Sequence, residues 1–494
     1  MKTIKKLYKN LLILFVIIGG VACTELESQL SGVIDPNSFP KTEDDVKALA
    51  VSCYVPFSSN RYNGIFTVSQ RGYQIVGDVT TDLGTCRWNG WNAIIYQNWN
   101  ADTEVITYFY NYVRDYNKFT YILSMIENTD INENVKKRAI AEVKCARGFM
   151  GYLLYNWFGP FSVATREQLQ DPLSNEVVPR PTEEQMVAII EKDLKEAAVD
   201  LNYKYSGSEF GRFTKGVCNT LLLKLYMLDQ QWEKATEIGR ELRNPLYGYD
   251  LVRTSYADIF TFANQQNSEI IFATVCNQKN AQLWLAHVLP NIYPTQNTRI
   301  VKWNGYKIPW EFMSTFETND KRLASIISTF KGTNGTTYTK TNPGNYLREG
   351  AIPMKYGEDP NALGEESSID WIVFRYADVL TLLAEAIVRE NNTVTQEALD
   401  LVNDVRGRAG LTGYTLTRYS TQGVTKFLED VLLERGHELW FEGVRREDLI
   451  RHGKYKEAAL QKGSTTAQDW YIRMPLPQKV INEGKGQIKQ NPEY

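Results

Sequence analysis

WIVFRYADVLTLLAEAIVRE (residues 371–390) and TQEALDLVNDVRGRAG (residues 395–410) are the neighbouring stretches that decide the fold class of this chain. Each has the spacing of apolar residues that is typical of an amphipathic helix. Ala386 and Ala398 stand twelve residues apart, an interval at which small side chains let the two helices of a tetratricopeptide repeat approach closely. The two stretches therefore predict a tightly packed pair of helices.

The same phase recurs earlier, in TKGVCNTLLLKLYMLDQ (214–230) and QWEKATEIGRELRN (231–244), where Leu223, Tyr226 and Ala235 occupy the contact positions. Stacked pairs of this kind bury a continuous core. We therefore predict an all-α dominated fold built on tetratricopeptide-like helical hairpins. Further amphipathic helices are predicted over residues 100–129, 132–160, 181–201 and 424–453.

Local signals mark where these further helices start, stop or bend. Gly159 and Pro160 end the second helix, because proline cannot continue it. Thr182, with Gln185 three residues later, forms a capping box at the start of the third. Gly443 predicts a bend in the last.

The pattern changes between about residues 244 and 370. EIIFATV (269–275) predicts a short strand, and the rest is dense in turn residues. Long irregular stretches in a compact protein are usually functional or disordered, and an abundance of aromatic residues argues against disorder. We predict a loop-rich insertion with a few short strands, which holds Trp284, Tyr293, Trp303, Tyr306 and Trp310.

The first residues are typical of an export signal. Four lysines precede the apolar run LLILFVIIGGV, which has the length of a signal-peptide core and is too short to span a bilayer. The run ends at GVAC, which is similar to a bacterial lipobox, although Gly20 stands where leucine is usual. We predict a signal peptide over 1–22, a lipidated Cys23, a polar tether over 23–40 and one composite domain over 41–494.

The remaining cysteines are not expected to form a set of disulfide bonds. Five cysteines follow Cys23 at wide spacing, which is no disulfide framework, although a single Cys53–Cys86 bridge stays open. Cys145 and Cys218 lie in helical apolar patterns and are expected in the core.

The acidic segment GDVTTD has two interpretations. Asp78 and Asp82 either bind calcium or form a turn or helix cap, and the turn or cap is favoured.

Several function classes find no support in the residues. A net charge of −3 gives no reason to expect a nucleic-acid partner. The chain has only three histidines and lacks a nucleophile elbow, an HExxH motif, a Walker loop and a dinucleotide fingerprint. We predict neither an enzyme nor a cofactor-dependent protein.

Taken in order, these segments are similar to the SusD/RagB family of Bacteroidetes surface lipoproteins, over essentially all of the chain after Cys23. The most specific block is LLERGHELWFEGVRREDLIRHGKY (432–455), where His437 departs from the basic residue that is common in the family. Its alternating Glu and Arg residues suit ion pairs within or between helices. The residues that match the family pattern are Glu434, Arg435, Glu438, Leu439, Phe441, Glu442, Gly443, Arg445, Asp448, Leu449, Arg451, Gly453 and Lys454.

The resemblance implies a fold, a place and a partner. The fold would be four tetratricopeptide-like hairpins with an irregular insertion over one face. The protein would be lipid-anchored at the outer-membrane surface and would close like a lid on a TonB-dependent, SusC-like barrel. It would capture an oligosaccharide or polysaccharide between the lid and the barrel for import. A peptide-binding member of the family, or less plausibly a helical glycoside hydrolase, stays open as an alternative.

The loop RWNGWNAIIYQNW (87–99) is the first candidate ligand site. Its front half has neither helical nor strand periodicity, and Gly90 and the asparagines suit a turn. An exposed indole matches the apolar face of a pyranose, and amide side chains match its hydroxyl groups. Because the resemblance puts ligand contacts in this loop and in the insertion, the predicted ligand-binding residues are Trp88, Asn89, Trp91, Asn92, Trp284, Trp303, Tyr306 and Trp310. The alternative is that these rings fill gaps between helices or contact the barrel.

Other conspicuous residues are expected to be structural. NDKR (319–322) is interpreted as a local charge network. The tryptophans that lie in or next to helical patterns are expected in the core, and they are Trp99, Trp157, Trp232, Trp371 and Trp440.

Overall fold

Both predicted helical pairs are present in the computed structural model, which describes residues 39–171, 176–277 and 280–494. The first pair is α10 (Lys215–Leu228) with α11 (Trp232–Glu241), and the second is α14 (Tyr376–Asn391) with α15 (Gln396–Arg408). Ala235, Ala386 and Ala398 are fully buried in these contacts. Small side chains at the twelve-residue interval therefore do bring the paired helices together.

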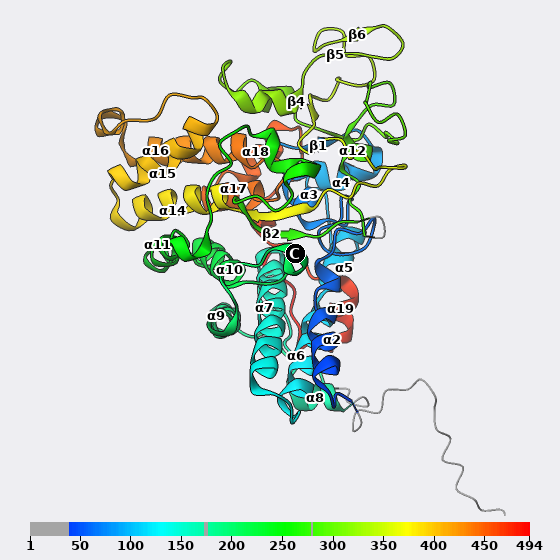
Figure 1. Ribbon diagram of the computed structural model, residues 1–494, viewed down its shortest axis with the longest axis vertical. Helices are drawn as coiled ribbons and strands as arrows, with labels where there is room; N and C mark the ends of the chain where they lie inside the picture. Colours follow the sequence, from blue (N-terminus) through cyan, green and yellow to red (C-terminus); the bar gives the residue numbers. More distant parts are fainter. Residues whose placement is uncertain (1–38, 172–175, 278–279) are drawn as a thin grey trace, which may run out of the picture. The chain divides into compact units, whose positions relative to one another are not determined.

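The helices follow one another in space as they do along the chain, within the compact unit Thr42–Tyr494. α6 (Val113–Glu127) packs on α7 (Glu133–Phe158), α7 on α9 (Glu183–Asp200), α9 on α10, α11 on α14, and α14 and α15 on α16 (Leu416–Glu438). Figure 1 shows α6 and α7 at the lower end of the view and α14 to α16 at its left edge. The capping box Thr182–Gln185 is present at the start of α9. Helices thus dominate the fold, as predicted.

Two predicted helices are interrupted. The segment 100–129 divides into α5 (Glu104–Tyr110) and α6, because Phe109 and Tyr110 on α5 pack against Trp157 and Phe158 of α7. The segment 424–453 leaves the helix after Glu438 and resumes at α17 (Arg445–Arg451). Gly443 in this gap has φ +80°, and a Cβ there would lie 2.5 Å from Gln74 Cα. The sequence signal at Gly443 therefore marks a break rather than a bend.

The short strands pair antiparallel in two-stranded sheets. β2 (Ile270–Thr274) is the predicted strand, and its partner is β8 (Trp371–Arg375). The prediction that residues 371–375 begin a helix is wrong, because all five are buried and pair with β2 before α14 starts. The other sheets join β1 (Thr85–Cys86) to β3 (Tyr306–Lys307), β4 (Ile326–Ile327) to β7 (Ile352–Pro353), and β5 (Phe330–Lys331) to β6 (Thr337–Tyr338).

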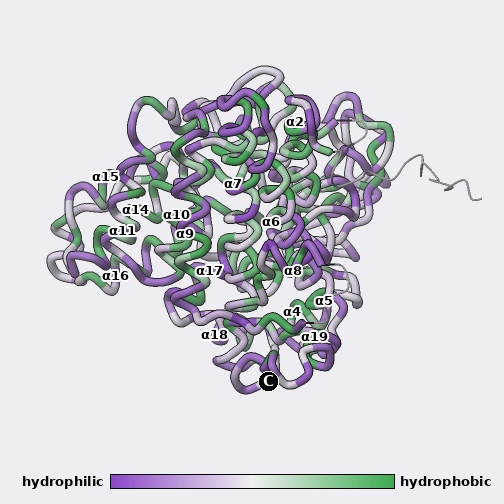
Figure 2. Tube along the Cα trace, turned by 90° about the horizontal axis from the view of Figure 1, so that it is seen from below, coloured by the Kyte–Doolittle hydropathy of each residue, from purple (hydrophilic) through white to green (hydrophobic). Residues whose placement is uncertain are grey.

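Shorter helices complete the fold. They are α2 (Glu43–Ser52), α3 (Tyr73–Val79), α4 (Asn92–Ile95), α8 (Arg166–Gln170), α12 (Trp284–Val288), α13 (Trp310–Met313), α18 (Tyr455–Gln461) and α19 (Gln478–Glu483). Two of them, α3 and α12, are buried along their whole length. Figure 2 shows hydrophobic and hydrophilic residues alternating along the helices, as expected where one side of each helix is buried. No helix in the three described ranges is both long and apolar enough to cross a bilayer.

A buried charge cluster joins the irregular region to the last helices. Arg375, at the end of β8, donates to Glu269 at 2.7 Å and to Glu442 at 2.7 Å, and its Nη1 is 2.5 Å from Glu438 Oε1. Arg322 bonds Glu438 at 3.1 Å, and Arg408 also donates to Glu438. The residues 319–322 and the Glu–Arg block of α16 are therefore structural, and their ion pairs run between distant segments.

The expected core residues are mostly where the patterns predict. Trp99, Trp157, Trp371 and Trp440 are buried, whereas Trp232 is half-buried and stacks with Arg389. The Cys53–Cys86 bridge does not form: both thiols are free and buried, and Cys53 Sγ is bonded to Leu49 O within its own helical segment. Cys145 and Cys218 are also buried and free. The predicted signal peptide, Cys23 and nearly all of the tether lie outside the described residues.

Candidate ligand-binding site

The two-residue ribbon β1–β3 unites the two predicted ligand-binding segments. Thr85 pairs with Lys307 and Cys86 with Tyr306, and Arg87 N–H extends the pairing by donating to Gly305 O at 3.2 Å. The chain then turns through a short 3₁₀ segment, Asn89–Trp91, into α4. The turn after β1 and the turn before β3 therefore lie side by side, although more than 200 residues separate them in the sequence.

Aromatic rings from both turns converge on Tyr306. The ring of Trp91 lies 5.2 Å from that of Tyr306 and nearly perpendicular to it, and the ring of Trp88 lies at 5.9 Å. His287 of α12 stacks on Tyr306 at 5.3 Å with an interplanar angle of 5°, and Trp303 meets His287 edge-on at 4.9 Å. Such geometries are favourable between rings and hold the group in one arrangement.

This group lines a pocket of about 460 Å³, which we call the aromatic pocket; its lining residues are Tyr62, Ser69, Gln70, Arg71, Trp88, Trp91, His287, Trp303 and Tyr306. Trp91 is 3% exposed and Tyr306 is fully buried, so these two form its inner wall. Trp88 and Trp303 are half-buried, and Tyr62 is 47% exposed. Trp88, Trp303 and Tyr62 therefore offer the ring surface that a ligand can reach.

Four of the eight predicted ligand-binding residues do not line this pocket. Trp284 is fully buried and its indole N–H donates to Pro353 O at 3.1 Å, so it belongs to the core. Trp310 is half-buried and its indole N–H donates to Leu347 O at 2.9 Å. Asn89 and Asn92 are exposed, and neither is among the residues that line the pocket. We leave these four out of the site that we propose below.

Five of the residues that line the pocket were not predicted from the sequence: Tyr62, Ser69, Gln70, Arg71 and His287. The first four lie in loops ahead of α3, where tyrosine, glutamine and arginine alternate with serine and glycine. That mixture of aromatic and hydrogen-bonding residues was a usable signal. His287 was hidden because it lies three residues after Trp284 in an apolar segment, α12, whose five residues are all buried.

His287 is an uncharged part of the pocket wall. Nδ1 lies 2.9 Å from Leu283 O, so Nδ1 carries the proton. Burial lowers the pKa of the imidazole from 6.5 to about 4, against the opposing effect of this hydrogen bond. Since the pKa is below its ordinary value, the unfolded chain takes up a proton between pH 6.5 and 4 that the folded chain does not.

We expect a pH dependence of both stability and ligand binding from this residue. The free energy of unfolding should fall as the pH drops from 6.5 to 4, and His287→Asn should lessen that part of the fall. Affinity for a neutral ligand should stay constant from pH 8 to 5.5. Urea titrations and calorimetric binding at these pH values would check both; an affinity that changes between pH 8 and 6 would contradict a neutral His287.

Gly305 sets the position of Trp88. A Cβ at this residue would lie 2.5 Å from the Trp88 ring and 2.8 Å from His287 O, so the indole must move to admit it. Gly305→Ala is expected to weaken ligand binding by about fivefold and to cost about 1–3 kcal/mol of stability through overpacking. Calorimetric binding and a urea titration would measure the two effects. Trp88→Ala in the same background should remove the part of the stability cost that comes from the indole and leave the part that comes from His287 O; if Gly305→Ala costs the same in both backgrounds, Trp88 is not a group displaced.

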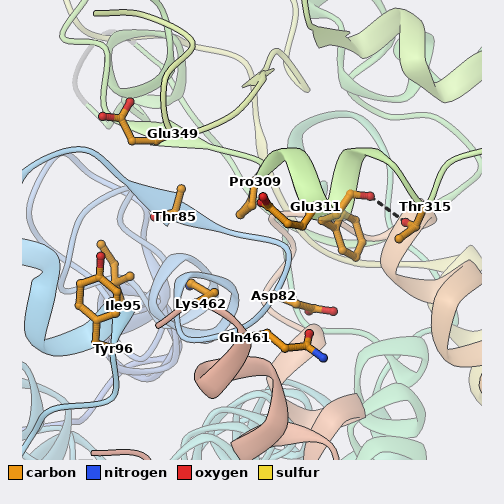
Figure 3. Close-up of a pocket in the computed structure, with 11 residues that line it drawn as sticks. Asp82, Thr85, Ile95, Tyr96, Pro309, Glu311, Thr315, Glu349, Gln461 and Lys462 are labelled. Carbon is orange, nitrogen blue, oxygen red and sulfur yellow. Dashed lines mark hydrogen bonds between the residues drawn. The ribbon is translucent and has the colours of Figure 1, made fainter. Parts of the chain in front are cut away.

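A second pocket lies on the opposite face of the same ribbon. Successive strand residues point to opposite faces: Tyr306 lines the aromatic pocket, whereas Thr85, which is paired with Lys307, lines the second one. Figure 3 shows this pocket of about 650 Å³, which we call the acidic pocket because Asp82, Glu311 and Glu349 line it. Lys462 also lines it and donates to Val79 O and Gly84 O, at 2.6 and 2.7 Å.

The carboxylates of Asp78 and Asp82 accept hydrogen bonds from N–H groups of the protein. Asp78 accepts the backbone N–H groups of Gly443 and Arg445, at 2.8 and 3.2 Å. Asp82 accepts hydrogen bonds from Nε and Nη2 of the Arg445 guanidinium, at 2.9 and 2.7 Å. The part of the chain that the structure describes contains no group of three or more His, Cys, Asp or Glu side chains that could hold a metal ion. The two carboxylates thus join α3 and the turn after it to Gly443 and Arg445, a contact between distant segments.

Comparison with known proteins bears on both the fold and the site. The model described as the SusD family matches residues 261–494. The SusD-like protein P25 of Formosa agariphila is 24% identical over 524 residues, which cover 96% of each chain. The surface glycan-binding protein A of Bacteroides thetaiotaomicron, solved in complex with laminarihexaose, superposes with a TM-score of 0.73 at 18% identity, covering 91% of this chain and 100% of its own. A laminarin-binding SusD-like protein superposes with a TM-score of 0.75 at 22% identity, covering 92% of this chain and 100% of its own.

Proposed function

We propose that this chain is a glycan-binding protein of the SusD family, whose model matches residues 261–494, and that its aromatic pocket holds an oligosaccharide or a segment of a polysaccharide. The observation that carries the proposal is the convergence of Trp88, Trp303 and Tyr62, from three separate segments, on one pocket. Two proteins of the same fold are described as bound to laminarihexaose and as laminarin-binding. Their ligands support the class of ligand, not its identity.

The pocket suits a pyranose in both shape and chemistry. A sugar ring has an apolar face of C–H groups, which packs on an indole, and a rim of hydroxyl groups, which needs hydrogen-bond partners. Trp88 and Trp303 supply the half-buried indoles. Gln70 and Tyr62 are exposed at the same pocket and supply both donors and acceptors for the hydroxyl groups. Trp91 and Tyr306 form the inner wall and fix the depth to which a ring can enter.

We further propose that capture serves import. The lipobox-like GVAC sequence at Cys23 supports a lipid anchor at the outer membrane, and family membership supports a SusC-like, TonB-dependent barrel as the partner. The protein would close on the barrel like a lid, with the glycan between them. Cleavage of the glycan would defeat such capture, so binding without catalysis is the consistent activity. Loss of palmitate labelling in Cys23→Ser would test the anchor.

A glycan panel measured by isothermal titration calorimetry tests the binding function. We expect one class of oligosaccharide to bind and a peptide panel to give no heat. The same mixtures, incubated for a day, should develop no reducing ends above background. Heat with peptides alone would favour a peptide-binding member of the family, and new reducing ends would identify a hydrolase.

A further inference from the structure

The aromatic pocket contains one charged side chain, and that side chain is a cation. Arg71 is the only Arg, Lys, Asp or Glu among its lining residues. His287 is neutral at physiological pH, since burial lowers its pKa to about 4. The acidic pocket on the other face of the ribbon has the opposite balance, with three lining carboxylates. The β1–β3 ribbon therefore separates a pocket lined by three carboxylates and Lys462 from one that is lined by Arg71 and no carboxylate.

Two carboxylates beside the chain segment of Tyr62 are already in ion pairs. Glu365 and Glu366 both bond Arg61, the residue before Tyr62, and Arg61 Nε lies 2.9 Å from Glu366. A negatively charged ligand near Tyr62 would thus meet ion pairs rather than free carboxylates. Nothing in the pocket lining opposes an anion.

The guanidinium of Arg71 is held in place, but its hydrogen-bond donors are not all used by the partner that holds it. Its Nη2 donates to Glu104 at 3.0 Å, and its guanidinium lies 4.9 Å above the ring of Tyr108. Glu104 is the first residue of α5, and its side chain is 81% exposed. An ion pair with so exposed a partner contributes little. A guanidinium has five N–H donors in a planar fork that fits a carboxylate or a sulfate, and the Glu104 bond uses one of them.

We infer that the glycan held in the aromatic pocket is acidic, and that Arg71 binds its carboxylate or sulfate group while Trp88 and Trp303 stack on the sugar rings. This inference rests on the proposed glycan-binding function. The ligand's anion would replace Glu104 as the main partner of Arg71, and Tyr108 would keep the guanidinium in position. Uronic acid residues and sulfate esters share the chemistry that this arrangement recognises.

The test compares matched oligosaccharides on the wild-type protein. Laminarihexaose serves as the neutral probe, a hexuronate oligosaccharide as the carboxylate probe and a sulfated hexasaccharide as the sulfate probe. We expect at least one acidic probe to bind about tenfold more tightly than the neutral probe at low salt, the value of one charge-assisted hydrogen-bonded contact. This preference should shrink as sodium chloride rises from 20 to 300 mM, whereas neutral binding should not change. The stronger acidic probe distinguishes uronate from sulfate.

Three single-charge variants then locate the effect. Arg71→Gln should lower the affinity for the acidic probe about tenfold and change the neutral affinity less than twofold. Arg71→Lys should restore only part of the loss, because an ammonium cannot bond two oxygens in a fork. Glu104→Gln, which removes the competing carboxylate, should raise acidic affinity about threefold. Glu311→Gln removes an equal charge from the acidic pocket and should change nothing at the aromatic pocket.

The outcomes separate this inference from the proposed function. Neutral binding equal to or tighter than acidic binding, or equal losses of both in Arg71→Gln, would overturn the acidic ligand and leave glycan binding intact. An absence of binding to every saccharide would overturn both. Circular dichroism would verify that each variant is folded.

Discussion

Glu438→Gln is expected to lower the free energy of unfolding by about 3–5 kcal/mol, because it removes one partner from a buried ion network. Glu438 is fully buried and accepts from Arg322, Arg375 and Arg408. Burial alone would raise the pKa of this carboxyl, but the three guanidinium groups hold it well below its usual range. The stabilisation is therefore present above the ordinary pKa of a glutamate and is lost as the pH falls toward the lower value.

A control on the same helix isolates burial as the cause. Glu429 also lies on α16, but its side chain is 44% exposed, with Lys454 at 3.6 Å and Lys426 at 4.0 Å. Glu429→Gln removes the same charge and should cost less than about 1 kcal/mol. Urea midpoints of the two variants provide the comparison. Equal midpoints would mean that the buried charge cluster does not stabilise the junction between the irregular region and α16.

The helices could be predicted because their signals are local. The small residues at the twelve-residue interval and the capping box at Thr182 depend on residues no more than about twelve positions away. The errors arose where distant contacts decide. Residues 371–375 have an apolar pattern that suits a helix, yet β2, a hundred residues away, pairs with them as a strand. The break at Gly443 depends on the close approach of Gln74 from α3.

The residues of the candidate site also differ in whether local sequence or distant contacts decide their position. Composition, turn residues and the family resemblance together singled out Trp88, Trp91, Trp303 and Tyr306, all of which line one pocket. Pattern alone could not tell Trp284 from these residues, because its burial depends on distant partners: its indole N–H donates to Pro353 O, and its ring packs against Trp371 and Phe441. Nor could it find Arg71, whose position follows from the packing of three separate loops. Side-chain direction, rather than residue type, was the missing information.

The double substitution Trp88→Ala and Trp303→Ala is expected to lower glycan affinity about a hundredfold. Each half-buried indole offers a stacking surface worth about 1.5 kcal/mol, which is about tenfold in the dissociation constant. The two rings reach the pocket from different segments, β1–α4 and the turn before β3, and each contacts His287 rather than the other. Each single variant should lose about tenfold, and because the two rings share His287 as a neighbour, the single and double variants together measure the coupling between them.

Stability and a matched aromatic substitution make this result decisive. Because both rings are half-buried and neither indole bonds a buried acceptor in the described residues, the double variant should fold with unchanged circular dichroism. Trp310→Ala is the control: it removes an equally half-buried indole that lies outside the pocket, so glycan affinity should stay within twofold of wild type. If the folded double variant binds as tightly as wild type, or if Trp310→Ala loses as much, the glycan is held elsewhere. A selective loss in the double variant would identify the aromatic pocket as the surface on which the sugar rings stack.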